Sequence, residues 1–215
     1  QYDYGVPERG PNMIGQLGFM KSLEKLGHEV VPFYYDEYLK KTDELQGALL
    51  NKADEVQPDL IFFILFQTQF KLETLNKLKE KYTTFNWFGD DSWRFDDFTS
   101  VYANAFTFCS TSDKFSLPKY KKIGQENVVM GQWAVINTPV PELIDVKYEF
   151  DVSFIGGFNY ARDWFLKSLE KRGIKVQAFG NGWPNGPVSL ERMNEIFLKS
   201  KINLNLSNSK SFDIR

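Results

Sequence analysis

Two adjacent glycines, Gly156 and Gly157, stand between an apolar stretch at residues 151–155 and a run that repeats an apolar residue every four positions. These patterns predict a strand that turns directly into a helix. Glycines in such a turn let backbone N–H groups approach a diphosphate, and the start of the helix favours the same anion. Arg162 would add a charge-assisted contact from the first helical turn. The spacing is not that of a dinucleotide-binding fold, so a tight turn beside a solvated arginine is the alternative interpretation.

Two further polar turns follow the next two predicted strands. Their residues are Gly180, Asn181, Gly182 and Trp183 in the first turn, and Ser207 and Asn208 in the second. Asparagine and glycine suit the positive backbone dihedral angles of a tight turn. Trp183 would offer a flat face to a base or a sugar ring, although a core position suits a tryptophan equally well. Three such turns at successive strand ends indicate a binding site more strongly than any one of them.

A pair of carboxylates, Asp90 and Asp91, directly follows the predicted strand at residues 83–88, and Trp93 and Arg94 come next. Paired carboxylates at a strand end are candidates for a general base or for holding sugar hydroxyls. Adjacent turn residues need not face the same site, and one carboxylate that caps the next helix is the alternative. A transition-metal site is not expected, because the chain has one His and one Cys.

The elements that would position these turns alternate between strand and helix along the whole chain. Strands are predicted at residues 29–35, 60–66, 83–88, 106–111, 127–133, 151–156, 176–180 and 202–207, with helical segments between them. Pro139 and Pro141 interrupt this series. We therefore expect two Rossmann-like, doubly wound α/β domains, at residues 1–135 and 151–215, joined by a linker at 136–150. In parallel sheets of this kind ligands bind at the carboxyl ends of the strands, and a cleft between the two domains is expected.

The two ends of the sequence depart from this pattern. The chain opens on the polar stretch QYDYGVPERG, where such a domain would begin with a strand, and it stops at Arg215 after three strands of the second domain. We therefore expect the first strand and the last part of the second domain to lie outside this sequence.

Composition and charge exclude several classes of function. The net charge is -2, with 26 basic against 28 acidic residues, so no surplus of positive charge exists to bind a nucleic-acid backbone. The longest apolar run, at residues 60–66, is far shorter than the ~20 residues that a membrane span needs. A single cysteine, Cys109, and the lack of a signal-like opening favour a cytoplasmic protein.

Several of these stretches together resemble the spore-maturation CgeB-like glycosyltransferases, a family with the two-domain GT-B fold. The resemblance runs through DYGVPERG, KSLEKLGHEV, NWFGDDSWRF, TSDKFSLPKYKKIG, NVVMGQWA, DVSFIGGFNYARDWF and KINLNLSNSKS. It implies a transferase that moves a sugar from a nucleotide-diphosphate donor to an acceptor of unknown identity. The family continues beyond the position of Arg215 into a segment that holds the donor, which puts the activity of this piece in doubt.

The resemblance also implies roles for individual residues. The donor would contact Gly156, Gly157, Arg162, Gly180, Asn181, Gly182, Trp183, Ser207 and Asn208. Asp90 and Asp91 would be catalytic, and Tyr4, Gly5, Arg9, Trp93 and Arg94 would lie on the acceptor side. No metal and no other cofactor are expected, because a helix dipole and basic side chains neutralise the leaving diphosphate in most such enzymes.

Two other functions stay open at this point. One is a non-catalytic module with the same fold, used in spore or cell-surface assembly, and the other is a sugar-nucleotide epimerase. The polar turns favour the transferase, because an inert scaffold would not need them at every strand end. The nucleotide, the sugar, the stereochemical outcome and the oligomeric state are not predicted by the sequence.

Overall fold

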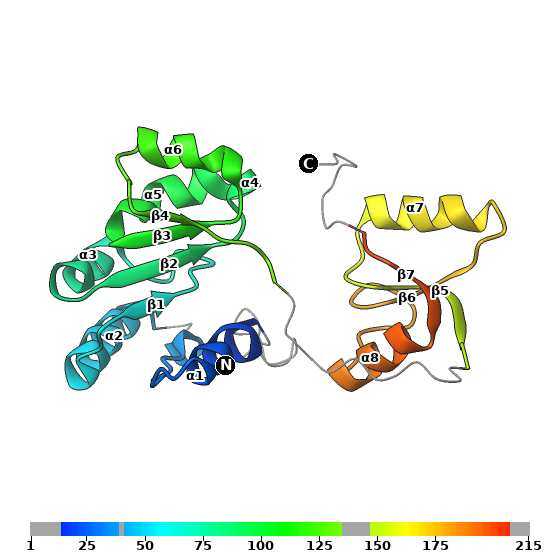
Figure 1. The fold of residues 1–215 in the computed structure, drawn as a ribbon, viewed down its shortest axis with the longest axis horizontal. Coiled ribbons are helices and arrows are strands. Elements are labelled where there is room, and N and C mark those ends of the chain that lie inside the picture. The colour runs from blue at the N-terminus through cyan, green and yellow to red at the C-terminus, as the bar shows by residue number, and fades with distance from the viewer. Residues whose placement is uncertain (1–13, 39–40, 135–146, 207–215) are drawn as a thin grey trace. The chain divides into compact units, whose positions relative to one another are not determined.

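The computed structural model describes residues 14–38, 41–134 and 147–206. The chain divides into two compact units, Gln1–Thr138 (unit 1) and Pro139–Arg215 (unit 2), shown in Figure 1. Each unit has one sheet of parallel strands with helices packed against it. The structure is therefore of the α/β class, with Rossmann-like parallel sheets, as the alternation of strands and helices predicts.

Unit 1 has a four-stranded sheet whose strands lie side by side in chain order. The strands are β1 (Ile61–Phe63), β2 (Thr84–Phe88), β3 (Phe108–Thr111) and β4 (Val128–Met130). Each neighbouring pair is parallel, with Phe85 opposite Phe108 as an example of the register. Parallel neighbours require a crossover, and a helical segment connects each consecutive pair.

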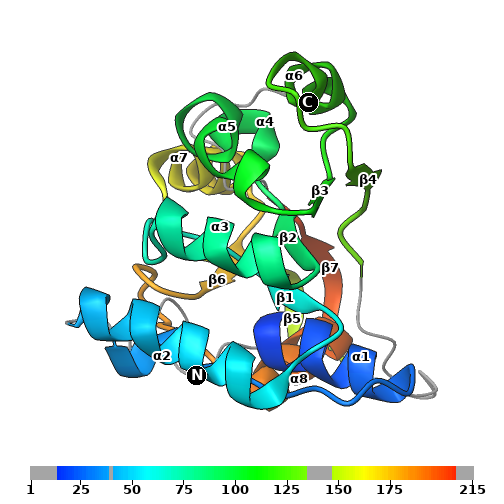
Figure 2. The same ribbon diagram turned by 90° about the vertical axis from the view of Figure 1, so that its left-hand side faces the viewer.

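The helical segments of unit 1 vary in length and regularity. They are η3 (Ile14–Met20), α1 (Lys21–Lys25), η4 (Tyr35–Tyr38), α2 (Thr42–Val56), α3 (Leu72–Lys81), α4 (Asp91–Arg94), η5 (Phe95–Thr99), α5 (Ser100–Tyr102), η6 (Ala103–Ala105), η7 (Lys114–Ser116) and α6 (Leu117–Lys122). The crossover from β2 to β3 is a series of short turns rather than one helix. Figure 2 shows α3 lying between α2 and α5.

Alternation along β1 and β2 divides the apolar side chains of unit 1 between the two faces of the sheet. On one face Phe63 and Phe88 join a large buried cluster with residues of α2, α3 and α5. On the other face Phe62 and Trp87 contact Phe19 of η3, at ring-centroid distances of 5.3 and 5.2 Å. Helical segments therefore cover β1 and β2 on both sides, which explains why residues 60–66 are apolar throughout.

The predicted strand at residues 29–35 does not form. Residues 28–34 have no regular structure, and Tyr35–Tyr38 is a short 3-10 helix. Pro32 has no N–H to donate to a ladder, and no described strand pairs with this segment. Its aromatic residues pack locally instead, because the rings of Phe33 and Tyr38 stack at 6.0 Å.

Unit 2 has a three-stranded parallel sheet in the order β6-β5-β7. The elements are β5 (Phe150–Ile155), α7 (Tyr160–Glu170), β6 (Val176–Phe179), α8 (Leu190–Leu198) and β7 (Ser200–Leu204). The crossover through α7 runs to one side of β5 and the crossover through α8 returns to the other side. Figure 1 shows these two helices on opposite faces of the sheet, which is the doubly wound arrangement. In the described part of both units, no helix is long and apolar enough to cross a membrane.

Candidate functional site

Asp91, at the start of α4, lies inside unit 1 with both carboxylate oxygens engaged. Its side chain is 1% exposed. The hydroxyl of Thr99 donates to Oδ1 at 2.6 Å, and the hydroxyl of Tyr120 donates to Oδ2 at 2.7 Å. The Ser116 hydroxyl also reaches the Asp91 carbonyl oxygen at 3.4 Å. The carboxylate thus joins α4, η5 and α6 and has no open path to a substrate.

Burial sets the protonation behaviour of this group. Burial raises the pKa of the Asp91 carboxyl above its ordinary value, although hydrogen bonds from Thr111, Thr99 and Tyr120 act in the opposite direction. The nearby Cys109 thiol is buried too, and its pKa rises to about 12. A thiol with that pKa stays protonated and unreactive near neutral pH. Neither group is suited to a reaction with solvent-borne substrates.

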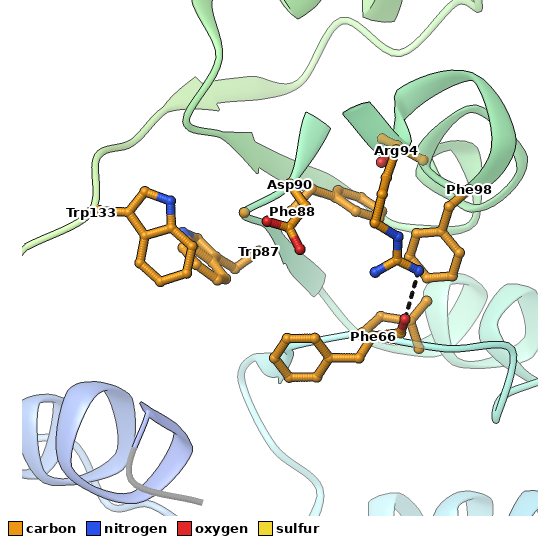
Figure 3. A pocket seen from close by; sticks show the side chains of 10 residues that line it. Phe66, Trp87, Phe88, Asp90, Arg94, Phe98 and Trp133 are labelled. Atoms are coloured by element: carbon orange, nitrogen blue, oxygen red, sulfur yellow. Dashed lines mark hydrogen bonds between the residues drawn. The ribbon is translucent and has the colours of Figure 1, made fainter. Parts of the chain in front are cut away.

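Asp90, the neighbouring residue, has a different environment. It occupies the N-cap position of α4 but makes no side-chain capping bond. Among the described residues its half-buried carboxylate has no hydrogen-bond or ion-pair partner. Figure 3 shows this carboxylate and the Arg94 guanidinium pointing into the same space, with the ring of Phe66 below. Of the two predicted carboxylates, Asp90 is the one that faces a pocket.

The pocket at Asp90 has a cavity volume of about 20 Å³. It is lined by Leu65, Phe66, Trp87, Phe88, Gly89, Asp90, Arg94, Phe98, Thr99 and Trp133. Arg94 donates from Nη2 to the Phe66 carbonyl oxygen at 2.6 Å, and its guanidinium lies 4.0 Å from the centre of the Phe98 ring. These contacts fix the arginine at the end of β1. Trp93 does not line the pocket and is 70% exposed, although its ring lies 5.5 Å from the Arg94 guanidinium.

Two tryptophans from different strand ends form the apolar wall of this pocket. The rings of Trp87 and Trp133 meet edge to face at 4.6 Å. Gly89 makes this pair possible, since a Cβ there would come within 2.5 Å of the Trp87 ring and 2.9 Å of the Trp133 ring. Trp133 lies three residues after β4, whereas the sequence pattern places it as the last residue of a strand at 127–133, and its position at that strand end was the available signal for including it in the site.

In unit 2 the turns after β5 and β6 interlock through their backbones. A Cβ at Gly180, whose φ is +123°, would lie 2.3 Å from the Gly156 carbonyl oxygen. The Trp183 indole N–H donates to that same oxygen at 2.8 Å. The Phe158 N–H donates to the Asn181 carbonyl oxygen, also at 2.8 Å. The two turns therefore form one rigid surface at the end of the sheet.

Packing of aromatic side chains supports the same two turns. Gly182 has a φ of +85°, and a Cβ there would approach the Phe158 Cβ to 2.6 Å. The Trp183 ring packs edge to face against Phe154 and Phe158, with centroid distances of 6.1 and 5.0 Å. Trp183 is thus occupied with the core of unit 2, which matches the structural interpretation left open by its sequence.

Arg162, on the first turn of α7, ties two strand ends together. Its guanidinium donates to the carbonyl oxygens of Gly157 and Leu206, each at 2.7 Å. The residue is 9% exposed, and burial lowers the pKa of the guanidinium. Asn159 caps the same helix by accepting a bond from the Arg162 N–H at 2.8 Å. The arginine positions the turn and places a positive charge beneath it.

Gly157 is the open point of this surface. No atom lies within 4 Å of the position that a Cβ would take, and the residue is exposed. Its backbone N–H has no hydrogen-bond partner in the part of the chain that the structure describes. An exposed donor at the start of an eleven-residue helix, above a buried arginine, can interact with an anion.

The structure brings most of the predicted residues into two groups. Asp90 and Arg94 share the pocket of unit 1, and the predicted residues from Gly156 to Trp183 gather at the strand ends of unit 2. Tyr4, Gly5, Arg9, Ser207 and Asn208 lie outside the described residues, as does most of the predicted linker. The described parts of the chain contain no group of three or more His, Cys, Asp or Glu side chains that could hold a metal ion. Comparison of the sequence with protein-family models and with curated proteins finds no match.

Proposed function

We propose that this chain is a glycosyltransferase that takes a sugar from a nucleotide-diphosphate donor bound at the Gly156–Gly157 turn of unit 2. The acceptor would present its hydroxyl at the Asp90 pocket of unit 1. The observation that carries the proposal is the open backbone at Gly157. A glycine-built surface leaves the Gly157 N–H, two residues before the cap of α7, without a partner among the described residues, and the Arg162 guanidinium bonds the carbonyl oxygen of the same glycine. Backbone donors of this kind contact a diphosphate without the bulk of a side chain.

The proposed reaction assigns one task to each site. The bond between the sugar carbon and the diphosphate oxygen breaks, and the α7 terminus with the Arg162 charge stabilises the departing anion. A bond forms between the same carbon and the acceptor oxygen. The acceptor proton passes to the Asp90 carboxylate, which among the described residues has no other partner. Asp91 takes no part, because both of its oxygens already accept hydrogen bonds inside the protein.

Nucleotide binding tests the donor site. Thermal shift with UDP-, GDP-, dTDP- and CMP-linked sugars should reveal a ligand that stabilises the protein, since binding to the native state raises stability. Gly157→Val should abolish that shift while the fold is kept, because the added side chain meets open space. Gly47→Val is the matched control, since Gly47 also has open space around it but lies in α2 of unit 1. A Gly157→Val protein that binds as wild type does would contradict the proposal.

Turnover tests the catalytic role. Asp90→Asn keeps the shape of the side chain but removes its charge, so turnover with the donor found above should fall about 10²-fold or more. The midpoint of thermal unfolding should not change, because the Asp90 carboxylate makes no hydrogen bond or ion pair with the described residues that the substitution could remove. Nucleotide binding without any transfer would instead favour a non-catalytic module.

A further inference from the structure

We propose that the Asp90 pocket of unit 1 takes a single hydroxyl of a sugar ring and that Trp133 is the surface on which the ring lies. The inference rests on the proposed function, because it names the class of acceptor as a saccharide. It is carried by the charge, the size and the aromatic wall of one pocket.

The two charged side chains of the pocket favour a neutral ligand group that can both donate and accept a hydrogen bond. The pocket contains one carboxylate, Asp90, and one guanidinium, Arg94, and no ion pair joins them in the described part of the chain. A ligand carboxylate would be repelled by Asp90, and a ligand ammonium would be repelled by Arg94. A hydroxyl satisfies both, because it donates one hydrogen bond and accepts others.

The volume of the pocket limits the part of a ligand that can enter it to one small polar group. A cavity of about 20 Å³ holds roughly one water-sized oxygen and cannot enclose a six-membered ring. The rest of the ligand must therefore lie outside the pocket, against residues at its rim. We therefore expect one hydroxyl of the ligand to enter the pocket while its ring stays on the surface.

An aromatic surface is present at the rim. Trp133 is 57% exposed, although its ring packs edge to face with Trp87 at a centroid distance of 4.6 Å. Gly89 lets the two indoles lie against the backbone at the point where Asp90 begins α4. A flat, fixed and exposed indole buries the apolar C–H face of a sugar ring at little cost in side-chain entropy. The ring hydroxyl beside that face would then reach Asp90 and Arg94.

The binding test uses the full chain without any nucleotide. The probes are the methyl glycosides of glucose, galactose, mannose and N-acetylglucosamine, together with cyclohexanol, a ring that has one hydroxyl. Binding of each probe is measured by saturation-transfer NMR. At least one glycoside should bind, cyclohexanol should bind because it also offers one hydroxyl and an apolar ring face, and tetrahydropyran, a ring of similar size without a hydroxyl, should bind more weakly. Trp133→Ala and Asp90→Asn should each weaken binding about tenfold or more, the usual effect of losing a bond to a charged group or an aromatic contact.

Two further variants control for misfolding. Trp133→Phe keeps an aromatic ring and should retain most of the binding that Trp133→Ala loses. Trp164→Ala removes a tryptophan of similar exposure, 62%, from α7 of unit 2 and should leave glycoside binding unchanged. The inference is overturned if no glycoside binds the wild-type chain, or if Trp133→Ala and Asp90→Asn both bind as well as wild type.

The two proposals fail separately. Glycoside binding is measured without a nucleotide, so a chain that binds glycosides and no nucleotide contradicts the donor site while it supports the saccharide pocket. A chain that binds a nucleotide and transfers its sugar to a non-saccharide acceptor supports the transferase and overturns the saccharide pocket.

Discussion

The strand ends of the two units are held in place by different means. In unit 1 side chains do this, because the buried Asp91 carboxylate accepts bonds from Thr99 and Tyr120. In unit 2 close backbone packing of Gly180 against Gly156 is added to the bonds that the Arg162 side chain makes. The strand ends of unit 1 are therefore held by a polar side-chain network, and those of unit 2 also by glycine contacts.

The two cores also differ in size. Unit 1 has a large buried cluster of aromatic and aliphatic residues in which a carboxylate is surrounded by hydroxyl donors. In unit 2 the buried cluster consists of Phe154, Leu166 and Ala178. The buried hydroxyls of Ser153 and Ser200 bond to each other between β5 and β7, whereas close backbone contacts hold the turns after β5 and β6. Loss of a side chain should matter most in unit 1, and addition of a Cβ should matter most in unit 2.

The largest expected effect on stability is at Asp91. Asp91→Ala leaves the hydroxyls of Thr99 and Tyr120 buried without an acceptor, so the free energy of unfolding of unit 1 should fall by about 3 kcal/mol or more. Asp90→Ala is the matched control and should stay within about 0.5 kcal/mol of wild type. Urea denaturation, with amide hydrogen exchange to locate the loss, measures both. If the two alanine variants lowered the free energy of unfolding equally, Asp90 and Asp91 would not differ in their contribution to stability.

Arg162 is the next position, because this buried side chain of unit 2 joins separate segments as Asp91 does in unit 1. Arg162→Ala removes the bonds to Gly157 and Leu206 and should weaken nucleotide binding by about 1.5–3 kcal/mol. Arg162→Lys keeps the charge without the geometry that bonds both carbonyl oxygens. Calorimetry that shows full binding by the lysine variant would mean that charge alone matters there, and full binding by the alanine variant would remove Arg162 from the site.

The glycine contact of unit 2 gives the third test. Gly180→Ala places a Cβ 2.3 Å from the Gly156 carbonyl oxygen at a positive φ, so it should destabilise unit 2 by about 1–3 kcal/mol. Gly157→Ala, in open space, should have almost no effect on stability. Hydrogen exchange at β5 and β6 measures the difference. If Gly180→Ala is as stable as wild type, the two turns are not interlocked in solution.

The smallest expected effect is the pH dependence that Asp91 contributes. Because the folded-state pKa of Asp91 is raised, the folded protein binds a proton more tightly than the unfolded chain does. This contribution to stability is fully present below the unfolded pKa and is lost as the pH rises through the folded pKa. The stability of wild type relative to Asp91→Asn should therefore increase as the solution is acidified from neutral pH. A difference that stays constant, or falls, would show that the carboxyl is not protonated more readily in the folded state.

Much of the fold could be predicted because the signals are local. The alternation of apolar stretches with helical runs predicts β1, β2, β3, β4 and the three strands of unit 2, since each pattern is set by neighbours in sequence. The same reasoning failed at residues 29–35, where β-branched and aromatic residues suggest a strand. A strand needs a partner to pair with, and none of the described strands provides one.

The sequence by itself determined the places where chemistry is to be sought: the polar and glycine-rich turns that follow each strand. Only the tertiary structure decided what each residue does there. Asp90 and Asp91 are adjacent and chemically identical, yet Tyr120 of α6 binds one and leaves the other facing a pocket. Trp133 joins that pocket because the chain after β4, which pairs with β3 in the same sheet, brings its ring against Trp87 of β2. Contacts between segments far apart in the chain create these differences, so the spacing of neighbouring residues cannot predict them.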